Sequence, residues 1–317
     1  MRRHRTAATT VLAVTTLLAG ALSATSAGAA PVPSPPSTPP PASFAPQQAP
    51  QGFWTADRMR GATPLDLVRT VPGALKAPEP GGKKTVVAPT AFPQPGGPWT
   101  GGGAVVKTSG RVFFTFQGRT ASCSGNSVTS QNGSTVITAG HCVKYQGSWH
   151  TNWVFVPAYN NGQAPYGQWS ATKTLATDQW AASEDINYDV GAAVVAPLNG
   201  KTLAQTVGAQ GLQFNGGYNK AMYAFGFPAA DPYDGSKLIH CSGNSSKDFL
   251  FSQDHSLGCN MTGGSSGGPW FTSFSEATGT GLQVSVNSFG YTFLPNRMFG
   301  PYFGNEAKAV YDKAQTS

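Results

Sequence analysis

The chain has 317 residues, with 21 lysines and arginines, 14 aspartates and glutamates, and a formal net charge of +7. Charged residues make up only 11% of it, against roughly 25% in ordinary soluble domains, which excludes a coiled coil and argues against long surface helices. The charge would suggest an acidic partner, but residues 98–317 hold 12 basic and 11 acidic residues, so nucleic-acid binding is not expected.

Residues 1–29 have the pattern of a secretory signal peptide. Three arginines lie within the first five residues, and a mostly apolar run follows at 11–22. This run is shorter than the ~20 residues that a membrane-spanning helix needs, and Ala27-Gly28-Ala29 matches an A-x-A cleavage site. We predict cleavage after Ala29, secretion, and a mature protein without a membrane segment. An N-terminal membrane anchor is the alternative.

Residues 30–100 are predicted to be a proline-rich pro-segment or linker. Most of the chain's 25 prolines lie here, and their fixed φ angles and missing N–H groups favour an extended segment outside the core. One short helix is predicted within residues 55–75. The Pro- and Gly-rich stretch 77–103 is an accessible place for proteolysis, so we expect the mature chain to begin between about Gly96 and Gly110. A mere spacer is the alternative.

The remaining residues are predicted to form an all-β body. Short apolar runs are bounded by Gly, Asn, Asp, Pro or Ser, and no long helical pattern lies between them, which argues against a βαβ fold. The exception is Gly304–Gln315, where apolar residues at helical spacing and Asn305 as N-cap predict a C-terminal helix. An antiparallel barrel, a sandwich or two small barrels would suit this body. The predicted strands are Arg111–Phe116, Thr135–Ala139, Trp153–Val156, Val190–Ala196, Ala221–Gly226, Gln283–Val286 and Ser288–Thr292.

The four cysteines lie in this body and allow three disulfide pairings. The local pairing, Cys123–Cys142 and Cys241–Cys259, closes two loops of about 20 residues, each of which would stabilise the fold by ~3 kcal/mol. A zinc site is the competing use, but the chain has neither C-x-x-C nor HExxH. We therefore predict the two disulfides, no metal and no cofactor.

The segment Gly263–Pro269, with the sequence GGSSGGP, carries the clearest chemical signal. Glycines on both sides of a serine allow a tight turn, close approach of a substrate, and two N–H groups aimed at one oxyanion. The segment also contains G-x-S-x-G, which is the nucleophile elbow of α/β-hydrolases, with Ser266 at its centre. A Gly/Ser-rich loop without chemistry is the alternative.

Chain order separates the hydrolase classes. All five histidines precede Ser266, whereas an α/β-hydrolase needs its histidine after the serine. The subtilisin order needs an aspartate before the histidine, and ahead of His141 there are only Asp57 and Asp66, in the zone expected to be removed. The order His, Asp, Ser remains.

His141 and Asp189 best fit the first two places. His141 lies just after a β-branched run, Thr135–Thr138, and is followed at once by a cysteine, so its backbone would be held rigidly, as a general base requires. Asp189 directly precedes an apolar run, where burial would let it orient an imidazole. Asp185 is the alternative carboxylate, and His240 and His255 are weaker alternatives to His141.

Three segments together resemble the signature of the chymotrypsin-like serine proteases: TAGHC at 138–142, YDVG at 188–191 and GSSGGP at 264–269. Their separations suit that family, and Ser288-Phe289-Gly290 resembles its substrate-pairing strand. The chain looks most similar to the bacterial secreted, V8-like branch. The resemblance implies two perpendicular six-stranded antiparallel β-barrels with a cleft between them and a C-terminal helix, over residues 101–317.

The resemblance also implies the roles of individual residues. Ser266 would be the nucleophile, His141 the general acid and base, and Asp189 its orienting partner, with the N–H groups of Gly264 and Ser266 as the oxyanion hole. The implied function is a secreted serine endopeptidase, made as a zymogen, monomeric and acting on proteins or peptides. A catalytically inactive binding protein of the same fold is the alternative. The implied substrate-binding residues are Asn260, Gly263, Asn287, Ser288, Phe289 and Gly290.

The chain departs from the family pattern at three positions. Ser265 stands where many members carry an aspartate that anchors a freed N-terminus, so activation by that salt bridge is not expected. Asn260 replaces the aspartate of trypsin-like members, and Asn287 stands where glutamyl-specific members carry histidine. An uncharged specificity pocket is therefore predicted.

Overall fold

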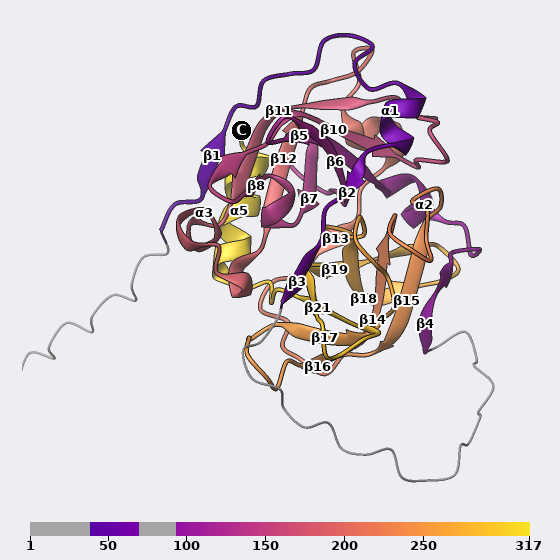
Figure 1. Cartoon of the computed structure of the whole chain (residues 1–317), viewed down its shortest axis with the longest axis vertical. Coiled ribbons are helices and arrows are strands. Elements are labelled where there is room, and N and C mark those ends of the chain that lie inside the picture. Colours follow the sequence, from indigo (N-terminus) through magenta and orange to yellow (C-terminus); the bar gives the residue numbers. More distant parts are fainter. Residues whose placement is uncertain (1–38, 70–92) are drawn as a thin grey trace, which may run out of the picture. The chain divides into compact units, whose positions relative to one another are not determined.

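The computed structural model describes residues 39–69 and 93–317, and strands dominate this part of the chain (Figure 1). The predicted signal peptide, residues 1–29, and the predicted cleavage site within it lie outside the described residues. They stay predictions, as does the boundary between pro-segment and protease domain.

Six antiparallel strands form a closed first barrel. Their order is β11-β10-β5-β6-β7-β12, and β12 pairs back to β11. Strands β5, β7, β10 and β12 coincide with predicted apolar runs. The bounds are β5 Ser109–Phe116, β6 Arg119–Val128, β7 Thr135–Thr138, β10 Thr151–Pro157, β11 Trp169–Ala176 and β12 Gly191–Val195.

Strand β6 was not predicted, because its sequence RTASCSGNSV has almost no large apolar side chain. Its small residues are buried because neighbouring strands approach closely. A Cβ atom on Gly125 would lie 3.0 Å from Val136 Cγ1 and 3.1 Å from Val112 Cγ2. Small residues fill this tightly packed part of the barrel, where local hydrophobicity is a poor guide to a strand.

The second half of the body consists of two sheets. One has the order β13-β19-β18-β14-β15-β4, and the other β16-β17-β21-β20-β3. The first sheet comprises β13 Gly211–Leu212, β19 Thr280–Val286, β18 Pro269–Ser275, β14 Ala221–Gly226, β15 Ile239–Asn244 and β4 Gln94–Pro98. The second comprises β16 Ser246–Lys247, β17 His255–Gly258, β21 Arg297–Gly300, β20 Phe289–Tyr291 and β3 Leu67–Arg69.

The helices are short except for the last one. The C-terminal helix α5 spans Asn305–Gln315, as predicted, and buries Ala307, Val310 and Ala314 in the same core as the first barrel. Its N-cap is Gly304, whereas Asn305 is the first helical residue. The other elements are α1 Ala56–Arg60, α2 Ala104–Thr108, α3 Asp178–Ser183, α4 Leu203–Val207 and the hairpin of β8 Lys144–Tyr145 with β9 Ser148–Trp149.

Residues 39–69 belong to the same compact unit as the rest of the described chain. Strand β1, Ala42–Phe44, pairs with β11, and β2, Thr63–Pro64, pairs with β6. Helix α1 confirms the short helix predicted within residues 55–75. Figure 1 shows this indigo stretch running from α1 through β2 to β3. The predicted pro-segment therefore packs on the body over these residues.

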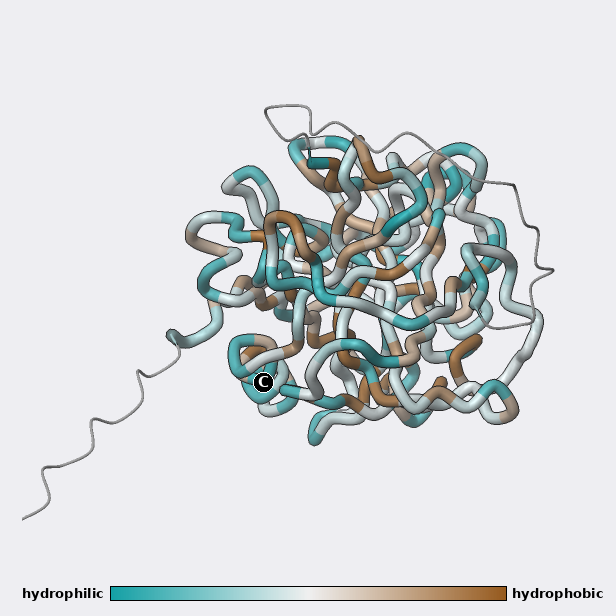
Figure 2. The backbone as a smooth tube through the Cα atoms, turned by 90° about the horizontal axis from the view of Figure 1, so that it is seen from below, coloured by the Kyte–Doolittle hydropathy of each residue, from teal (hydrophilic) through white to brown (hydrophobic). Residues whose placement is uncertain are grey.

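Both predicted disulfides are present, Cys123–Cys142 in the first barrel and Cys241–Cys259 in the second half. Figure 2 shows hydrophilic segments mainly in the peripheral loops and hydrophobic ones in the interior. None of the helices in the described ranges is long and apolar enough to cross a membrane.

Candidate active site

A 3₁₀ turn, Gly140–Cys142, holds His141 at the end of β7. Strand β7 pairs with β12 so that Thr138 lies opposite Gly191, which brings the residues just before β12 to this turn. Gly140 has to be small, because a Cβ atom there would lie 2.7 Å from the Trp180 ring and 2.9 Å from Asp189 Oδ1. The disulfide at Cys142 ties the other end of the turn to β6.

Asp189 holds His141 through two contacts. His141 Nδ1 lies 2.7 Å from Asp189 Oδ2, and the His141 backbone N–H donates to Asp189 Oδ1 at 2.7 Å. Both residues are 0% exposed. An Nδ1–H donated to the carboxylate leaves Nε2 as the basic nitrogen, which is the arrangement of a general base. Among the described residues, Nε2 has no hydrogen-bond partner.

Ser288 provides a third contact to this carboxylate, since its Oγ donates to Asp189 Oδ2 at 2.6 Å. This contact joins the start of the predicted substrate-pairing strand to the His–Asp pair. Sequence reasoning placed Ser288 among the substrate-binding residues and missed its contact with the aspartate. No local pattern could have indicated it, because the two residues are 99 positions apart.

The alternative residues lie in other settings. Asp185 Oδ1 accepts from the backbone N–H of Asn187 and caps the 3₁₀ turn before Asp189. His240 Nδ1 contacts the Gly97 carbonyl oxygen at 3.1 Å. His255 lies on β17, and burial lowers its pKa to about 4. None of these three residues has a contact with His141 among those that the structure describes.

The serine loop packs against the end of β7, beside the histidine turn. A Cβ atom on Gly267 would lie 2.1 Å from Thr138 Oγ1, so only glycine fits there. The Ser266 carbonyl oxygen accepts from the Ser124 backbone N–H at 2.7 Å and lies 3.6 Å from Cys142 Sγ. Ser266 is 3% exposed. The fold thus brings the predicted nucleophile to the turn that carries His141.

Gly264 presents its backbone N–H to the site. Its φ angle is +92°, a conformation that favours glycine, and its N–H donates to the carbonyl oxygen of Leu65 at 3.1 Å. Ser266 Oγ lies 3.5 Å from the same oxygen. A carbonyl oxygen is therefore held by one of the two predicted oxyanion donors, beside the hydroxyl of the predicted nucleophile.

Asn287 holds the serine loop through hydrogen bonds of its side chain and backbone. Its Nδ2 donates to the Ser265 and Phe225 carbonyl oxygens at 2.9 and 2.8 Å, and its Oδ1 accepts from Trp270 Nε1 at 2.6 Å. Its backbone oxygen accepts from Gly267 N at 2.7 Å. Asn287 is 0% exposed, so this amide acts inside the protein. Its predicted contact with substrate stays a prediction.

The remaining substrate-binding candidates lie around the serine loop. Phe289 and Gly290 belong to β20, and Gly263 directly precedes Gly264, the predicted oxyanion donor. Asn260 is half-buried; its Oδ1 accepts from the Tyr233 hydroxyl at 2.6 Å, and its backbone N–H donates to Pro95 at 2.8 Å. A neutral amide thus occupies the position from which specificity was predicted.

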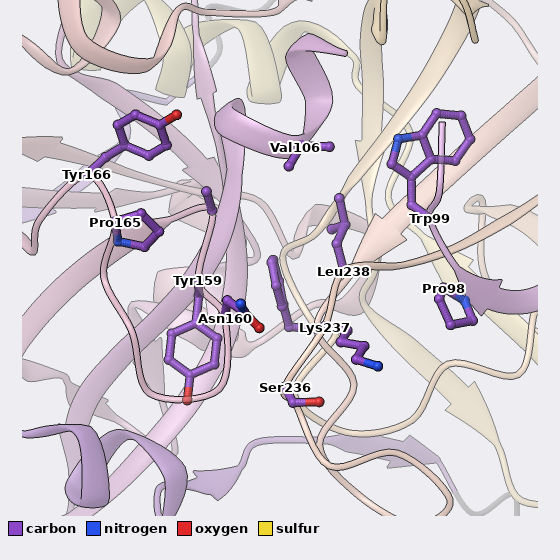
Figure 3. Close-up of a pocket in the computed structure, with 12 residues that line it drawn as sticks. Pro98, Trp99, Val106, Tyr159, Asn160, Pro165, Tyr166, Ser236, Lys237 and Leu238 are labelled. Atoms are coloured by element: carbon purple, nitrogen blue, oxygen red, sulfur yellow. The ribbon is translucent and has the colours of Figure 1, made fainter. Parts of the chain in front are cut away.

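A separate pocket of about 420 Å³ lies away from these residues (Figure 3). Tyr159, Asn160 and Tyr166 line one side of it and Lys237 and Leu238 the other. It contains neither His141, Asp189 nor Ser266, so it is not the candidate active site.

One group of potential metal ligands occurs in the described ranges, formed by Cys123, His141 and Cys142. The two sulfur atoms are joined in a disulfide, and His141 Nδ1 contacts Asp189. A thiolate is the metal-binding form of cysteine, so this group does not fit a metal site.

Two solved structures resemble the chain over most of their length. The protease Anisep from Arthrobacter nicotinovorans is 46% identical, with a TM-score of 0.63, and the match covers 67% of this chain and 96% of that one. The thermostable serine protease AL20 from an extremophilic microorganism is 42% identical, with a TM-score of 0.64, and covers 68% of this chain and 99% of that one. No family model matches the chain.

One curated relative is named an extracellular metalloprotease, from Bacillus subtilis (strain 168). It is 28% identical over 180 residues, which are 55% of this chain and 54% of that protein. The chain thus spans about half the length of the curated relative it matches. The name of that relative implies a metal ion. The described residues of this chain offer no group of ligands that fits one, because the cysteines of the candidate group form a disulfide.

The chain is more than 40% identical to two proteases over nearly their whole length. Its closed antiparallel barrel, second β half and C-terminal helix agree with the fold expected from the sequence. The predicted place in the bacterial V8-like branch is consistent with these findings. The chain belongs to the chymotrypsin-like serine protease family.

Proposed function

We propose that the chain is a secreted serine endopeptidase that works through Ser266, His141 and Asp189. His141 Nε2 takes the proton of the Ser266 hydroxyl as Oγ attacks a peptide carbonyl carbon. The protonated imidazole then gives this proton to the leaving amine, and an acyl-enzyme remains. Water, activated by the same nitrogen, cleaves the ester and restores Ser266.

The observation that carries this proposal is the buried network around His141. Asp189 contacts Nδ1 at 2.7 Å and is itself held by Ser288, which favours the imidazolium formed when Ser266 loses its proton. The Gly264 N–H, already aimed at a carbonyl oxygen, supports the assignment of the oxyanion hole. One such donor is worth about 10²–10³ in rate.

We further propose an uncharged preference at the residue before the scissile bond. The Asn260 amide is engaged by the Tyr233 hydroxyl and carries no charge to pair with a lysine, arginine or glutamate of the substrate. Secretion is in keeping with the two disulfides, which persist in oxidising compartments. Protein or peptide substrates and a monomeric state remain part of the same proposal.

Hydrolysis of casein and of a small ester by the processed protein tests the proposal. Asp189→Asn should lower kcat by about 10⁴-fold, because the amide would hold His141 in the wrong tautomer. Asp185→Asn, its neighbour on the same turn, is the matched control and should keep near wild-type activity. Equal activity of wild type and Ser266→Ala would refute the assignment, and no hydrolysis by wild type would favour the inactive binding protein.

A further inference from the structure

Residues 63–69 lie across the candidate active site and connect its two halves. Strand β2 runs parallel to β6, with Thr63 opposite Ala121, and the next N–H, of Leu65, donates to the Ser122 carbonyl oxygen at 3.0 Å. Strand β3 then runs parallel to β20, with Leu67 opposite Phe289. Figure 1 shows this indigo stretch passing from the first barrel into the second half.

The middle of the segment occupies the place of a reacting carbonyl group. The Leu65 oxygen accepts from the Gly264 N–H at 3.1 Å, and Ser266 Oγ is 3.5 Å away. Asp66 covers Gly263, where an added Cβ atom would lie 2.9 Å from the Asp66 Cβ. A substrate carbonyl needs the same N–H donor, so the segment and a substrate exclude each other.

The following strand occupies the edge that was predicted to pair with substrate. Leu67 is 8% exposed and shares a hydrophobic cluster with Phe289 and Tyr291, whereas Val68 is 56% exposed. The Thr292 N–H donates to the Arg69 carbonyl oxygen at 3.2 Å. Backbone pairing with a buried alternate side chain is how an extended peptide binds a sheet edge.

A folded anchor holds the segment in place from the N-terminal side. Trp54 and Met59 are 3% and 2% exposed and pack in one cluster with Phe113 of β5. Trp54 Nε1 donates to the Asn152 carbonyl oxygen at 2.8 Å, and Gln168 Nε2 donates to the Trp54 carbonyl oxygen at 2.7 Å. A tethered occupant binds at high effective concentration, even when its own contacts are few.

We propose that residues 63–69 are an intramolecular inhibitor of this active site, bound as an uncleaved strand that must leave before a substrate can enter. This inference rests on the proposed function. It adds that the segment blocks two elements directly: the Gly264 donor and the edge of β20. The predicted pro-segment would then keep the enzyme inactive by occupying the site. Activation by an N-terminal salt bridge is not expected, because Ser265 stands in place of the aspartate that would form it.

Chain direction explains why the bound segment stays uncleaved. If a peptide binds in the opposite chain direction with its carbonyl oxygen in the same place, the Cα and N atoms on either side of the carbonyl carbon change places. Only one of the two directions therefore presents the leaving nitrogen to His141. We assign the parallel direction seen here to the unproductive case. Among the described contacts, Ser266 Oγ has no hydrogen bond to His141, and Nε2 has no partner that could pass a proton to the Asp66 nitrogen.

The test compares intact full-length chains that differ at neighbouring positions of β3. Leu67→Asp places a charge in an apolar site and should release the segment, while Val68→Asp places the same charge on the exposed side of the strand. Labelling of Ser266 by a fluorophosphonate should be slow in wild type and Val68→Asp. It should be roughly tenfold to a hundredfold faster in Leu67→Asp, in proportion to the loss of the closed state.

Hydrogen exchange of residues 288–294 provides a readout that does not depend on activity. Exchange there should rise in Leu67→Asp and stay at the wild-type level in Val68→Asp, because β20 loses its pairing with β3 only in the first and keeps β21 in both. Leu67→Ala, which introduces no charge, should move both readouts in the same direction by less. Intact mass should show the Leu65–Asp66 bond uncut in wild type.

Two results would overturn the inference: cleavage after Leu65, or faster exchange at 288–294 in Leu67→Asp without faster labelling. In the second case a protease site is inserted after Lys84, the chain is cut there and its N-terminal part is removed. This cut form shows whether the proposed function also fails. Labelling of Ser266 in that cut form would leave the proposed function standing. No labelling there would remove the proposed function as well.

Discussion

Asn287→Asp replaces a buried amide by a carboxylate of the same shape. The oxygen that accepts from Trp270 Nε1 is kept, but the Nδ2 donor to the Ser265 and Phe225 carbonyl oxygens is lost. Both carbonyl oxygens lose the amide donor and instead face an oxygen, although Ser265 keeps the Gly268 N–H at 3.0 Å. At about 1–3 kcal/mol for each of the two buried hydrogen bonds lost, the free energy of unfolding should fall by about 2–6 kcal/mol.

The same change should slow the chemical step, because the Ser265 carbonyl adjoins Ser266, the proposed nucleophile, and Gly267 N–H donates to the Asn287 backbone oxygen. Loss of alignment of the proposed oxyanion donors, Gly264 and Ser266, would lower kcat, whereas a lost substrate contact would raise KM. Urea unfolding and steady-state kinetics on one peptide substrate measure both effects. Unfolding free energy within 0.5 kcal/mol of wild type, with kcat unchanged, would refute the bracing role of Asn287.

Two further predictions follow from buried contacts of the site. Ser288→Ala removes one of the hydrogen bonds that hold the Asp189 carboxylate against His141, so kcat should fall by roughly tenfold while KM stays near the wild-type value; an unchanged kcat would contradict it. Burial lowers the pKa of His150 to about 3 from its ordinary 6.5, so the unfolded chain takes up a proton below pH 6.5 that the folded chain excludes. The free energy of unfolding should therefore fall by about 1.4 kcal/mol per pH unit from pH 6.5 towards 3. His150→Gln can still donate to the His141 carbonyl oxygen but has no group that titrates in this range. It should therefore flatten this slope, as measured by urea unfolding at several pH values.

The sequence predicted those parts of the molecule in which a few adjacent residues carry the signal. His141, Asp189 and the serine loop stand in short segments of distinctive composition, and aromatic or β-branched runs such as Arg111–Phe116 mark strands. The disulfides followed from loop length together with export. Each of these features depends on neighbours along the chain, so pattern and spacing were sufficient.

Features that depend on distant partners were not predictable in this way. Strand β6 is composed of small polar residues whose burial is decided by the strands beside it. The side-chain hydrogen bonds of Asn287 and Ser288 join segments that are far apart in the sequence. Leu67–Arg69 carries no local signal of its place beside the candidate site, because its pairing with Phe289–Tyr291 spans more than two hundred residues.

Trapping of the acyl-enzyme tests the central claim most directly. The processed protein is mixed with a slowly hydrolysed ester and quenched in acid, and the acylated peptide is identified by mass spectrometry. We predict the acyl mass on the peptide that contains Gly263–Pro269, attached at Ser266, and its disappearance in Ser266→Ala. An adduct on another residue, or turnover of the ester by Ser266→Ala at the wild-type rate, would contradict the account.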